Sequence, residues 1–320
     1  MNLRTSPIRL SVLALGLAAL APQAGAEMAL TSGATTAGFA LTTFATGFPL
    51  DGNIGPLGIA FSGGSVIVSD YPGNVRVFST DADGQSATSF PVAHNYGSHN
   101  AIGLASAGGA FYMTAQAAGN VMQINPDGTF NQMILPSLPS ATGIVSNPAN
   151  GHLFVSTGGF GAVVDINPIT KTSSIFKNIS ADGLTTDGVT LYAETNNSII
   201  GYRLSDGAQV FNSGSIGDGP DGTALGTGSL AGEIFVNTNG GRLLEYNLTG
   251  TPVATLIGTG GTRGDFVTVD PNGTLLLTQS DRILRLAAPQ GGGFGTPEPG
   301  TLALLGSFGV VASLLRRRRK

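Results

Sequence analysis

The chain has 320 residues, with 49 glycines, no cysteine and no tryptophan, and only 11% of its residues are charged. Residues 27–296 contain eight Lys and Arg against 18 Asp and Glu, which gives this stretch a net charge of −10. Such acidity argues against a nucleic-acid-binding protein, because phosphates must be met by basic groups, and the lack of cysteine excludes disulfides, thiol catalysis and zinc–thiolate sites.

Residues 1–26 have the pattern of a secretory signal peptide. Two arginines are followed by an apolar run over residues 10–20, and Ala24 and Ala26 supply the small side chains that signal peptidase requires. We therefore expect cleavage after Ala26 and export of the rest of the chain. The alternative is a buried N-terminal helix, which Pro22 disfavours because proline breaks helices.

The body of the chain repeats about every 40 residues. Six blocks begin with a strand rich in small residues, and their first residues lie 45, 40, 40, 39 and 43 positions apart. Each block continues with a second and a third apolar segment. Turn residues such as Asn-Pro, Asp-Gly or Thr-Gly close most of the third segments, and the first five blocks carry a looser fourth segment. Four short strands in about 40 residues are typical of a β-propeller blade. The blocks begin at Gly58, Gly103, Gly143, Gly183, Gly222 and, less regularly, Asp265.

These blocks predict an all-β fold, a six-bladed β-propeller over residues 27–288. The sixth block ends at Leu286 without a fourth strand, and residues 39–46 have the pattern of a strand that precedes the first block. We expect this N-terminal strand to complete the sixth blade and close the ring, which removes exposed sheet edges. The alternative is another all-β repeat, such as a β-helix or a pair of sandwiches.

The repeat style of the body also suggests relatives. The strand start Gly58-Ile59-Ala60 and the turn over residues 125–128 resemble those of the NHL, SMP-30 and streptogramin-lyase-like propellers. The resemblance to SMP-30-like lactonases implies a divalent metal ion held by a mixture of Glu, Asp and Asn. The resemblance to streptogramin lyases implies a histidine base on a later blade, and this sequence has no histidine after His152, which counts against that mechanism.

The loops that enter first strands and the turns after second strands lie on one face of a propeller, where functional groups collect. Here these positions are rich in acids and amides, whose hard oxygen atoms suit Ca²⁺ or another divalent cation. The alternative is that Asp and Asn cap turns by bonding nearby backbone amides. The candidate metal ligands are Asp182, Glu194, Asp221 and Asn237.

The end of the chain has three further parts. Residues 289–296 are rich in glycine and predict a flexible tether. Pro297, Glu298 and Pro299 follow, then an apolar stretch over residues 301–315 and five consecutive basic residues. As a helix the apolar stretch is about 22 Å long, short for a bilayer core of about 30 Å, and the basic residues would stay cytoplasmic.

This tail, residues 297–320, resembles the PEP-CTERM sorting signal of Gram-negative bacteria. The resemblance implies transient anchoring in the inner membrane, recognition by an exosortase and cleavage near Pro297-Glu298-Pro299, after which the protein reaches the cell surface or the extracellular space. It also implies a link to exopolysaccharide, biofilm or the envelope. The alternative is an ordinary C-terminal membrane anchor with a transmembrane helix.

Two functions therefore stand as hypotheses. The first is a surface or extracellular-matrix propeller that binds polysaccharide or an envelope protein and catalyses nothing, processed by signal peptidase and exosortase. The second is a divalent-metal-dependent lactonase or hydrolase that uses the acidic face of the propeller. Neither a nucleophile elbow, a phosphate-binding loop nor a His-Glu-x-x-His motif is present in the sequence.

Overall fold

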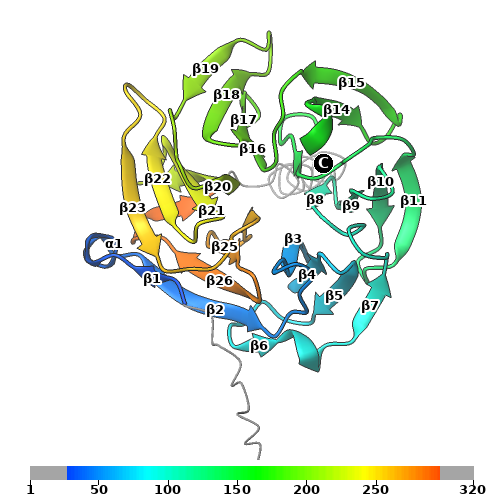
Figure 1. Cartoon of the computed structure of the whole chain (residues 1–320), viewed down its shortest axis with the longest axis horizontal. Coiled ribbons are helices and arrows are strands. Elements are labelled where there is room, and N and C mark those ends of the chain that lie inside the picture. Colours follow the sequence, from blue (N-terminus) through cyan, green and yellow to red (C-terminus); the bar gives the residue numbers. More distant parts are fainter. Residues whose placement is uncertain (1–26, 296–320) are drawn as a thin grey trace, which may run out of the picture.

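The structure, a computed structural model, describes residues 27–295. They form a ring of six mainly antiparallel sheets around a central axis (Figure 1), which confirms the predicted all-β, six-bladed propeller. No helix among the described residues is long and apolar enough to span a bilayer. The predicted signal peptide, the sorting motif and the apolar stretch over 301–315 lie outside the described residues.

The blades follow one another around the ring in chain order, and the first strand of each lies nearest the axis. Blade 1 has β3 (Pro56–Ser62), β4 (Ser65–Asp70), β5 (Asn74–Phe78) and β7 (Val92–Asn95). Blade 2 has β8 (Leu104–Ala107), β9 (Ala110–Ala115), β10 (Asn120–Ile124) and β11 (Phe130–Leu135). Blade 3 has β12 (Ile144–Ser146), β13 (Leu153–Ser156), β14 (Val163–Asn167) and β15 (Thr172–Lys177). Blade 4 has β16 (Leu184–Thr186), β17 (Thr190–Thr195), β18 (Ser198–Arg203) and β19 (Gln209–Asn212). Blade 5 has β20 (Pro220–Gly228), β21 (Glu233–Thr238), β22 (Leu243–Asn247) and β23 (Ala254–Thr259). Blade 6 has β24 (Val267–Val269), β25 (Leu275–Thr278), β26 (Arg282–Ala287) and the N-terminal β2 (Ala40–Thr46). The short helices are α1 (Ser32–Ala37), η1 (Ala87–Ser89) and η2 (Gly158–Phe160).

The ring closes as the sequence predicts. Strand β2 pairs antiparallel with β26, with Ala40 opposite Ala287 and Thr46 opposite Arg282. The short β6 (Gln85–Ser86), which follows β5 in the chain, adds parallel to the outer edge of β2. Blade 6 is thus completed by segments from the start of the described chain, which lie beside it in Figure 1.

Two more terminal strands join blade 5 and differ from expectation. Strand β1 (Ala29–Leu30) pairs with the outer strand β23. The predicted flexible tether contains β27 (Gly292–Phe294), which pairs with the inner strand β20. Phe294 is buried against Phe235, with ring centroids 4.9 Å apart. A glycine-rich strand pairs through its backbone alone, so its composition resembles that of a flexible linker.

The inner strands pass too close to one another for side chains. A Cβ atom built on Gly58 would lie 2.5 Å from the carbonyl oxygen of Ile102, and one on Gly143 would lie 2.1 Å from that of Asp182. The first glycine of a block therefore lets one blade contact the backbone of the next. This contact explains why glycine recurs at the start of the blocks.

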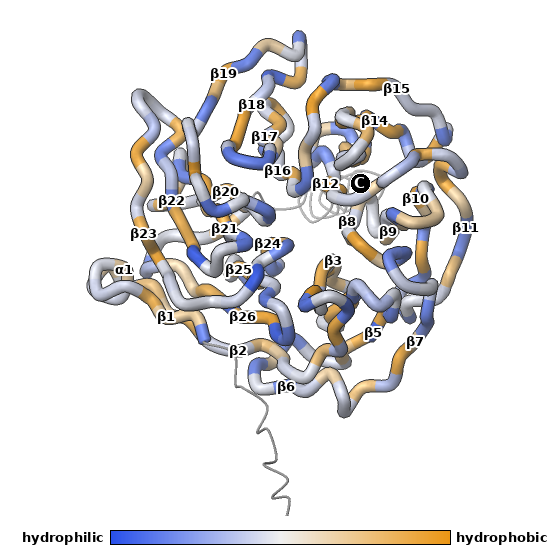
Figure 2. The backbone as a smooth tube through the Cα atoms, in the orientation of Figure 1, coloured by the Kyte–Doolittle hydropathy of each residue, from blue (hydrophilic) through white to orange (hydrophobic). Residues whose placement is uncertain are grey.

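The core lies between neighbouring blades. Figure 2 shows apolar residues along the strands and hydrophilic residues mainly in the loops. Phe44 of β2, for example, packs edge-on against Phe78 of β5, so blade 6 and blade 1 share one buried cluster. This packing holds the inner strand ends in fixed positions around the axis.

Candidate functional site

Two positions recur in every blade where the first strand begins. The inner position is the residue just before the first-strand residue that pairs with the second strand. The partner position is the second-strand residue that pairs with this first-strand residue, as Asn237 pairs with Gly222. In blade 3, for example, Thr142 N–H donates to Ser156 C=O and Ser156 N–H donates to Gly143 C=O. From blade 1 to blade 6 the inner positions are Leu57, Ile102, Thr142, Asp182, Asp221 and Asp265, and the partner positions are Ser69, Thr114, Ser156, Glu194, Asn237 and Thr278.

In blades 1 to 3 the partner position is a serine or threonine that joins two blades. The Ser69 hydroxyl accepts a hydrogen bond from Gly58 N–H at 3.0 Å and donates to the Ile102 carbonyl of blade 2 at 2.8 Å. Ser156 accepts from Gly143 N–H at 2.8 Å and donates to the Asp182 carbonyl of blade 4 at 2.7 Å. A small hydroxyl group therefore meets the structural need of this position.

Blade 4 carries Glu194 at the partner position instead. The residue is fully buried, and neither carboxylate oxygen has a well-formed hydrogen bond, although Gly183 N–H lies close. Burial and the negative charge of Asp182 raise the pKa of Glu194 well above its ordinary value. Because a hydroxyl fulfils the same structural role in blade 3, the fold does not require this carboxylate.

The inner position changes in the same half of the ring. Blades 1 to 3 have Leu, Ile and Thr there, whereas blades 4, 5 and 6 all have aspartate. Burial and the charge of Asp265 raise the pKa of Asp182 to about 6, and its Oδ1 is buried without a hydrogen-bond partner. Burial, followed by the charges of Asp182, Asp265 and Glu194, raises the pKa of Asp221 well above its ordinary value. We call Asp182, Glu194, Asp221 and Asp265 the carboxylate cluster.

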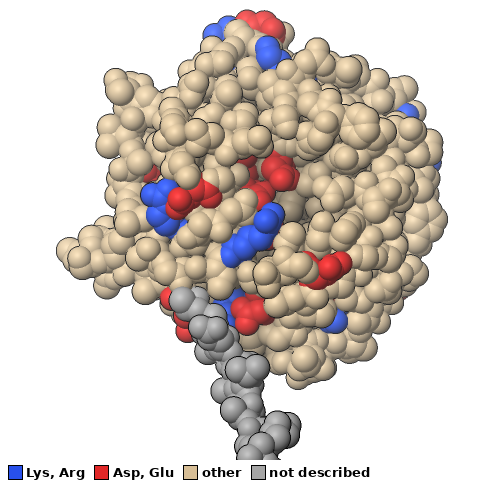
Figure 3. Space-filling view, in the orientation of Figure 1, with Lys and Arg blue, Asp and Glu red and all other residues tan. Residues whose placement is uncertain are grey.

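Arg263 is the basic side chain that contacts the carboxylate cluster. Its Nε donates to Asp265 Oδ1 at 2.6 Å, and its Nη2 lies 3.5 Å from Asp221 Oδ2. The Arg263 side chain is 39% exposed, while those of Asp221 and Asp265 are 4% and 6% exposed. Charged side chains gather near the centre of the face in Figure 3. One cation against four carboxyl groups leaves room for bound protons or a second cation.

The structure brings together three of the four predicted metal ligands: Asp182, Glu194 and Asp221 interact through their charges. Asn237 is engaged elsewhere, since its Nδ2 donates to the Thr278 carbonyl at 3.0 Å and its Oδ1 accepts from Gln279 at 3.4 Å. Asp265 and Arg263 join the three acids in the structure, although neither is among the metal ligands predicted from the sequence. The repeat pattern starts block six at Asp265, whereas Phe266 pairs with Thr278 as the first-strand glycines do elsewhere.

The carboxylate cluster only partly meets the needs of a metal ion. Within residues 27–295, no three Asp, Glu or His side chains are arranged so that they could hold a metal together. The unpartnered oxygens of Glu194 and Asp182, however, are acceptors of the kind that a cation or a proton would satisfy. A divalent ion therefore stays a prediction, with these two side chains as its first candidate ligands.

Other acids in the loops before first strands and after second strands have structural partners. Asp70 is buried and accepts hydrogen bonds from Asn74 and Arg76. Asp218 pairs with Arg242, and Asp281 pairs with its neighbour Arg282 at 2.8 Å. These residues fit the alternative interpretation of turn and loop stabilisation.

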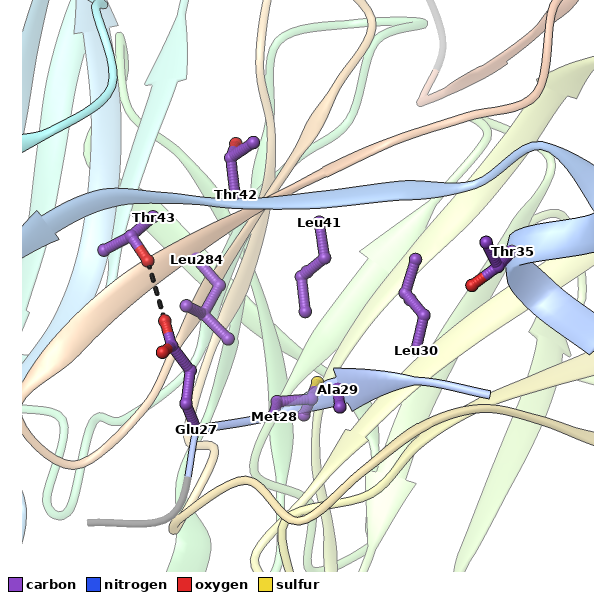
Figure 4. Close-up of a pocket in the computed structure, with 9 residues that line it drawn as sticks. All are labelled: Glu27, Met28, Ala29, Leu30, Thr35, Leu41, Thr42, Thr43 and Leu284. Atoms are coloured by element: carbon purple, nitrogen blue, oxygen red, sulfur yellow. Dashed lines mark hydrogen bonds between the residues drawn. The ribbon is translucent and has the colours of Figure 1, made fainter. Parts of the chain in front are cut away.

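A cavity of about 540 Å³ lies away from the carboxylate cluster, on the outer side of the ring between β1 and β2 (Figure 4). Leu30, Leu41 and Leu284 line its apolar part, and at one end Glu27 accepts a hydrogen bond from Thr43 at 3.0 Å. The cavity separates two strands that belong to different blades, so it marks the seam where the N-terminal segment closes the ring.

Comparison with protein families identifies residues 296–320 as a PEP-CTERM protein-sorting motif. The match confirms the sorting signal predicted from Pro297-Glu298-Pro299 and the residues after it, and it implies export, exosortase processing and a cell-surface destination. No curated protein matches the chain in sequence.

Solved structures with similar folds include three of known description. A gluconolactonase from Xanthomonas campestris has a TM-score of 0.64 and 18% identity, covering 82% of this chain and 95% of its own. A putative oxidoreductase (glucose dehydrogenase) from Thermus thermophilus has a TM-score of 0.60 and 17% identity, covering 78% and 100%. A virginiamycin B lyase from Staphylococcus aureus has a TM-score of 0.55 and 15% identity, covering 78% and 99%. At these identities the likeness establishes the fold alone.

Proposed function

We propose that this protein is an exported, exosortase-sorted surface or matrix propeller that binds exopolysaccharide or an envelope component through its charged axial face. The observation that carries the proposal is the sorting motif at residues 296–320, which directly follows a closed propeller. The propeller is hydrogen-bonded up to the last described residue, because Gly295 N–H donates to the Leu225 carbonyl at 2.6 Å. The last strand of the body, β27, ends at Phe294, three residues before Pro297.

The test follows the full chain in a bacterium that has an exosortase. We expect the surface fraction to contain protein that starts at Glu27 and lacks the residues after about Pro299, as read by mass spectrometry. We also expect it to co-purify with the extracellular polysaccharide. Intact Lys320 on surface-located protein, or equal amounts in polysaccharide-free washes, would contradict the proposal.

A matched pair of variants separates sorting from folding. Glu298→Gln changes the sorting motif, whereas Glu233→Gln changes a partly exposed glutamate at the start of β21. We expect the first variant to accumulate unprocessed in the membrane fraction. The second should be processed like the wild type.

A second candidate is a divalent-metal-dependent lactonase or hydrolase. The observation that favours it is a pair of carboxylates with buried, unpartnered oxygens beside Asp221: the fully buried Glu194 and the half-buried Asp182. The fold likeness to a gluconolactonase is consistent with it. When bound, a divalent ion would polarise a carbonyl oxygen, and Arg263 would orient a carboxylate or hydroxyl group of the substrate near it.

Calorimetric titration of the full chain with Ca²⁺, Mg²⁺, Mn²⁺ and Zn²⁺ tests this second candidate. Binding that is abolished in Glu194→Gln but kept in Asp206→Asn, an exposed carboxylate paired with Arg203, would support it. Turnover of a lactone in the presence of the bound ion would establish an enzyme. Absence of binding at millimolar metal would exclude a metalloenzyme.

A further inference from the structure

A second group of polar and aromatic side chains lies on blades 1 and 2, next to blade 6. The rings of Tyr71 and His99 stack with centroids 4.0 Å apart and planes 19° apart. Asp51 Oδ2 accepts a hydrogen bond from Ser98 at 2.8 Å and lies 3.3 Å from His99 Nε2. The side chains of His99 and Asp51 are 39% and 49% exposed, and Tyr71 is half-buried, so the stacked pair is partly open to solvent.

The stacked pair lies on the same face as the carboxylate cluster, where blade 1 meets blade 6. Tyr71 N–H donates to the Gly55 carbonyl at 2.8 Å, and a Cβ built on Gly55 would lie 2.1 Å from the Ser280 carbonyl oxygen. Ser280 N–H in turn donates at 2.9 Å to the hydroxyl of Thr262, the neighbour of Arg263. The pKa of Tyr71 is raised by burial and then by the charges of Asp51 and Asp265, while the charge of Arg263 lowers it. The phenol of Tyr71 therefore lies within electrostatic reach of both groups. A ligand that covers Tyr71 could extend from blade 2 to Arg263 on blade 6.

The backbone holds His99 in a conformation that glycine would adopt more easily. His99 has φ 63°, and its N–H donates to the Tyr71 carbonyl at 2.9 Å while its carbonyl accepts from Ala117 N–H at 3.0 Å. Most left-handed positions in the described chain are glycines. A histidine at such a position carries a conformational cost that glycine would not.

Several hydrogen-bonding groups around the stacked pair have no partner among the described residues. They are the Tyr71 hydroxyl, Asp51 Oδ1 and Arg263 Nη1, whereas Asp51 Oδ2 and the other Arg263 nitrogens that bond to acids are engaged. An exposed aromatic surface beside free acceptors and donors is suited to a ring that presents C–H groups on its face and hydroxyls on its edge. The C–H hydrogens meet the negative face of the π system, and hydroxyls form charge-assisted hydrogen bonds with carboxylate or guanidinium.

We propose that Tyr71 and His99 form a stacking subsite for a pyranose ring of a neutral polysaccharide, with Asp51 and Arg263 bound to its hydroxyl groups. The inference rests on the proposed polysaccharide-binding function and names its site and ligand class. The neutral class follows from the excess of acids, because Asp51 and the carboxylate cluster outnumber Arg263, the basic side chain that contacts the cluster. An anionic sugar would meet repulsion there.

The experiment measures retention of the full chain on gels that contain dextran, mannan, galactan or polygalacturonate. We expect retention on at least one neutral polymer and about tenfold weaker binding for Tyr71→Ala and His99→Gly. The glycine variant relieves the strained φ, so a loss of binding there does not report unfolding. Tyr71→Phe keeps the ring and should weaken binding less than threefold. Phe130→Ala, an exposed aromatic on β11, serves as the control and should bind like the wild type.

The outcomes separate the subsite from the proposed function. Wild-type retention that is unchanged in both Tyr71→Ala and His99→Gly would overturn the subsite and leave polysaccharide binding in place. Retention on polygalacturonate alone, with or without Ca²⁺, would overturn the neutral class. Absence of retention on every polymer would overturn the subsite together with the polysaccharide-binding part of the proposed function.

Discussion

Blades 1 to 3 and blades 4 to 6 share one backbone design but differ in the chemistry of two repeated positions. In the first half, the inner positions hold Leu, Ile and Thr, and the partner positions hold Ser, Thr and Ser. In the second half, the inner positions hold three aspartates, and the partner positions hold Glu194, Asn237 and Thr278. The backbone hydrogen bonds at these positions recur from one half to the other.

The difference separates what the fold needs from what it tolerates. The first half shows that small hydroxyls and apolar side chains suffice to join blades, since Ser69, Thr114 and Ser156 all bridge to the next blade. The second half places carboxyl groups at the same depth, where burial raises their pKa values. Buried carboxylates without partners destabilise a fold, so their concentration in one half marks it as the candidate functional site.

The largest effect is expected when the chemistry of blade 4 is transferred to blade 3. Ser156→Glu removes the bridge to the Asp182 carbonyl and buries a carboxylate beside Asp182. We expect a loss of about 3–5 kcal/mol in the free energy of unfolding, measured by urea denaturation at pH 8. An unfolding free energy close to that of the wild type would show that the two halves tolerate carboxylates equally.

A second substitution tests the feature that both halves share. Gly143→Ala would place a Cβ 2.1 Å from the Asp182 carbonyl oxygen, and Gly222→Ala would place one 2.7 Å from the Phe266 backbone. We expect each variant to lose about 3 kcal/mol, irrespective of the half. Gly33→Ala in α1, where the nearest atom is 3.9 Å away, should gain a few tenths of a kcal/mol. A strong loss in only one half would contradict a common backbone requirement.

The sequence predicts the propeller well because its signals are local and periodic. The block-start glycines and turn residues recur at intervals of about 40, and the missing fourth strand of block six leaves residues 39–46 as the closing strand. Strands β1 and β27 could not be predicted, because they contain two and three residues. Their pairing depends on backbone groups that a sequence pattern does not reveal.

The candidate site was predictable only in part, for a different reason. Asp182, Glu194 and Asp221 follow from their places in regular blocks. Asp265 belongs with them at the inner position, but Phe266 replaces the glycine that marks the start of most other blocks, which shifts the alignment by one residue. The engagement of Asn237 with Thr278 and Gln279 depends on side-chain contacts between blades 5 and 6, which no spacing in the sequence encodes.

The reverse transfer should stabilise the protein. Glu194→Ser removes the buried carboxylate and restores the hydroxyl found in blade 3, close to the Asp221 carbonyl. In the presence of a chelator we expect a gain of about 1–3 kcal/mol at pH 8. The measurement is urea denaturation of wild type and variant at several pH values. A loss of stability at pH 8 would indicate that the carboxylate has a structural partner after all.

The pH dependence of that gain has a definite sign. The folded protein holds the Glu194 proton more tightly than the unfolded chain, whose glutamate has an ordinary pKa near 4.5. Wild-type stability therefore falls as the pH rises from about 4.5 through the raised folded pKa. We expect the advantage of Glu194→Ser to be small at pH 4 and largest at pH 8, and a constant advantage across this range would contradict the shift.

The smallest expected effect concerns the cation that balances the acidic half. Arg263→Gln removes the partner of Asp265 and Asp221, which raises the pKa of both carboxyls further. Because the Arg263 side chain is 39% exposed and solvent screens its charge, we expect a loss of only about 1 kcal/mol at pH 8. The loss should be smaller at pH 4, because lowering the pH through the raised pKa values of Asp221 and Asp265 protonates these carboxyls and removes their attraction to the arginine. If the loss were equal at both pH values, Arg263 would act through packing, and the carboxylates of blades 5 and 6 would not depend on it for their charge.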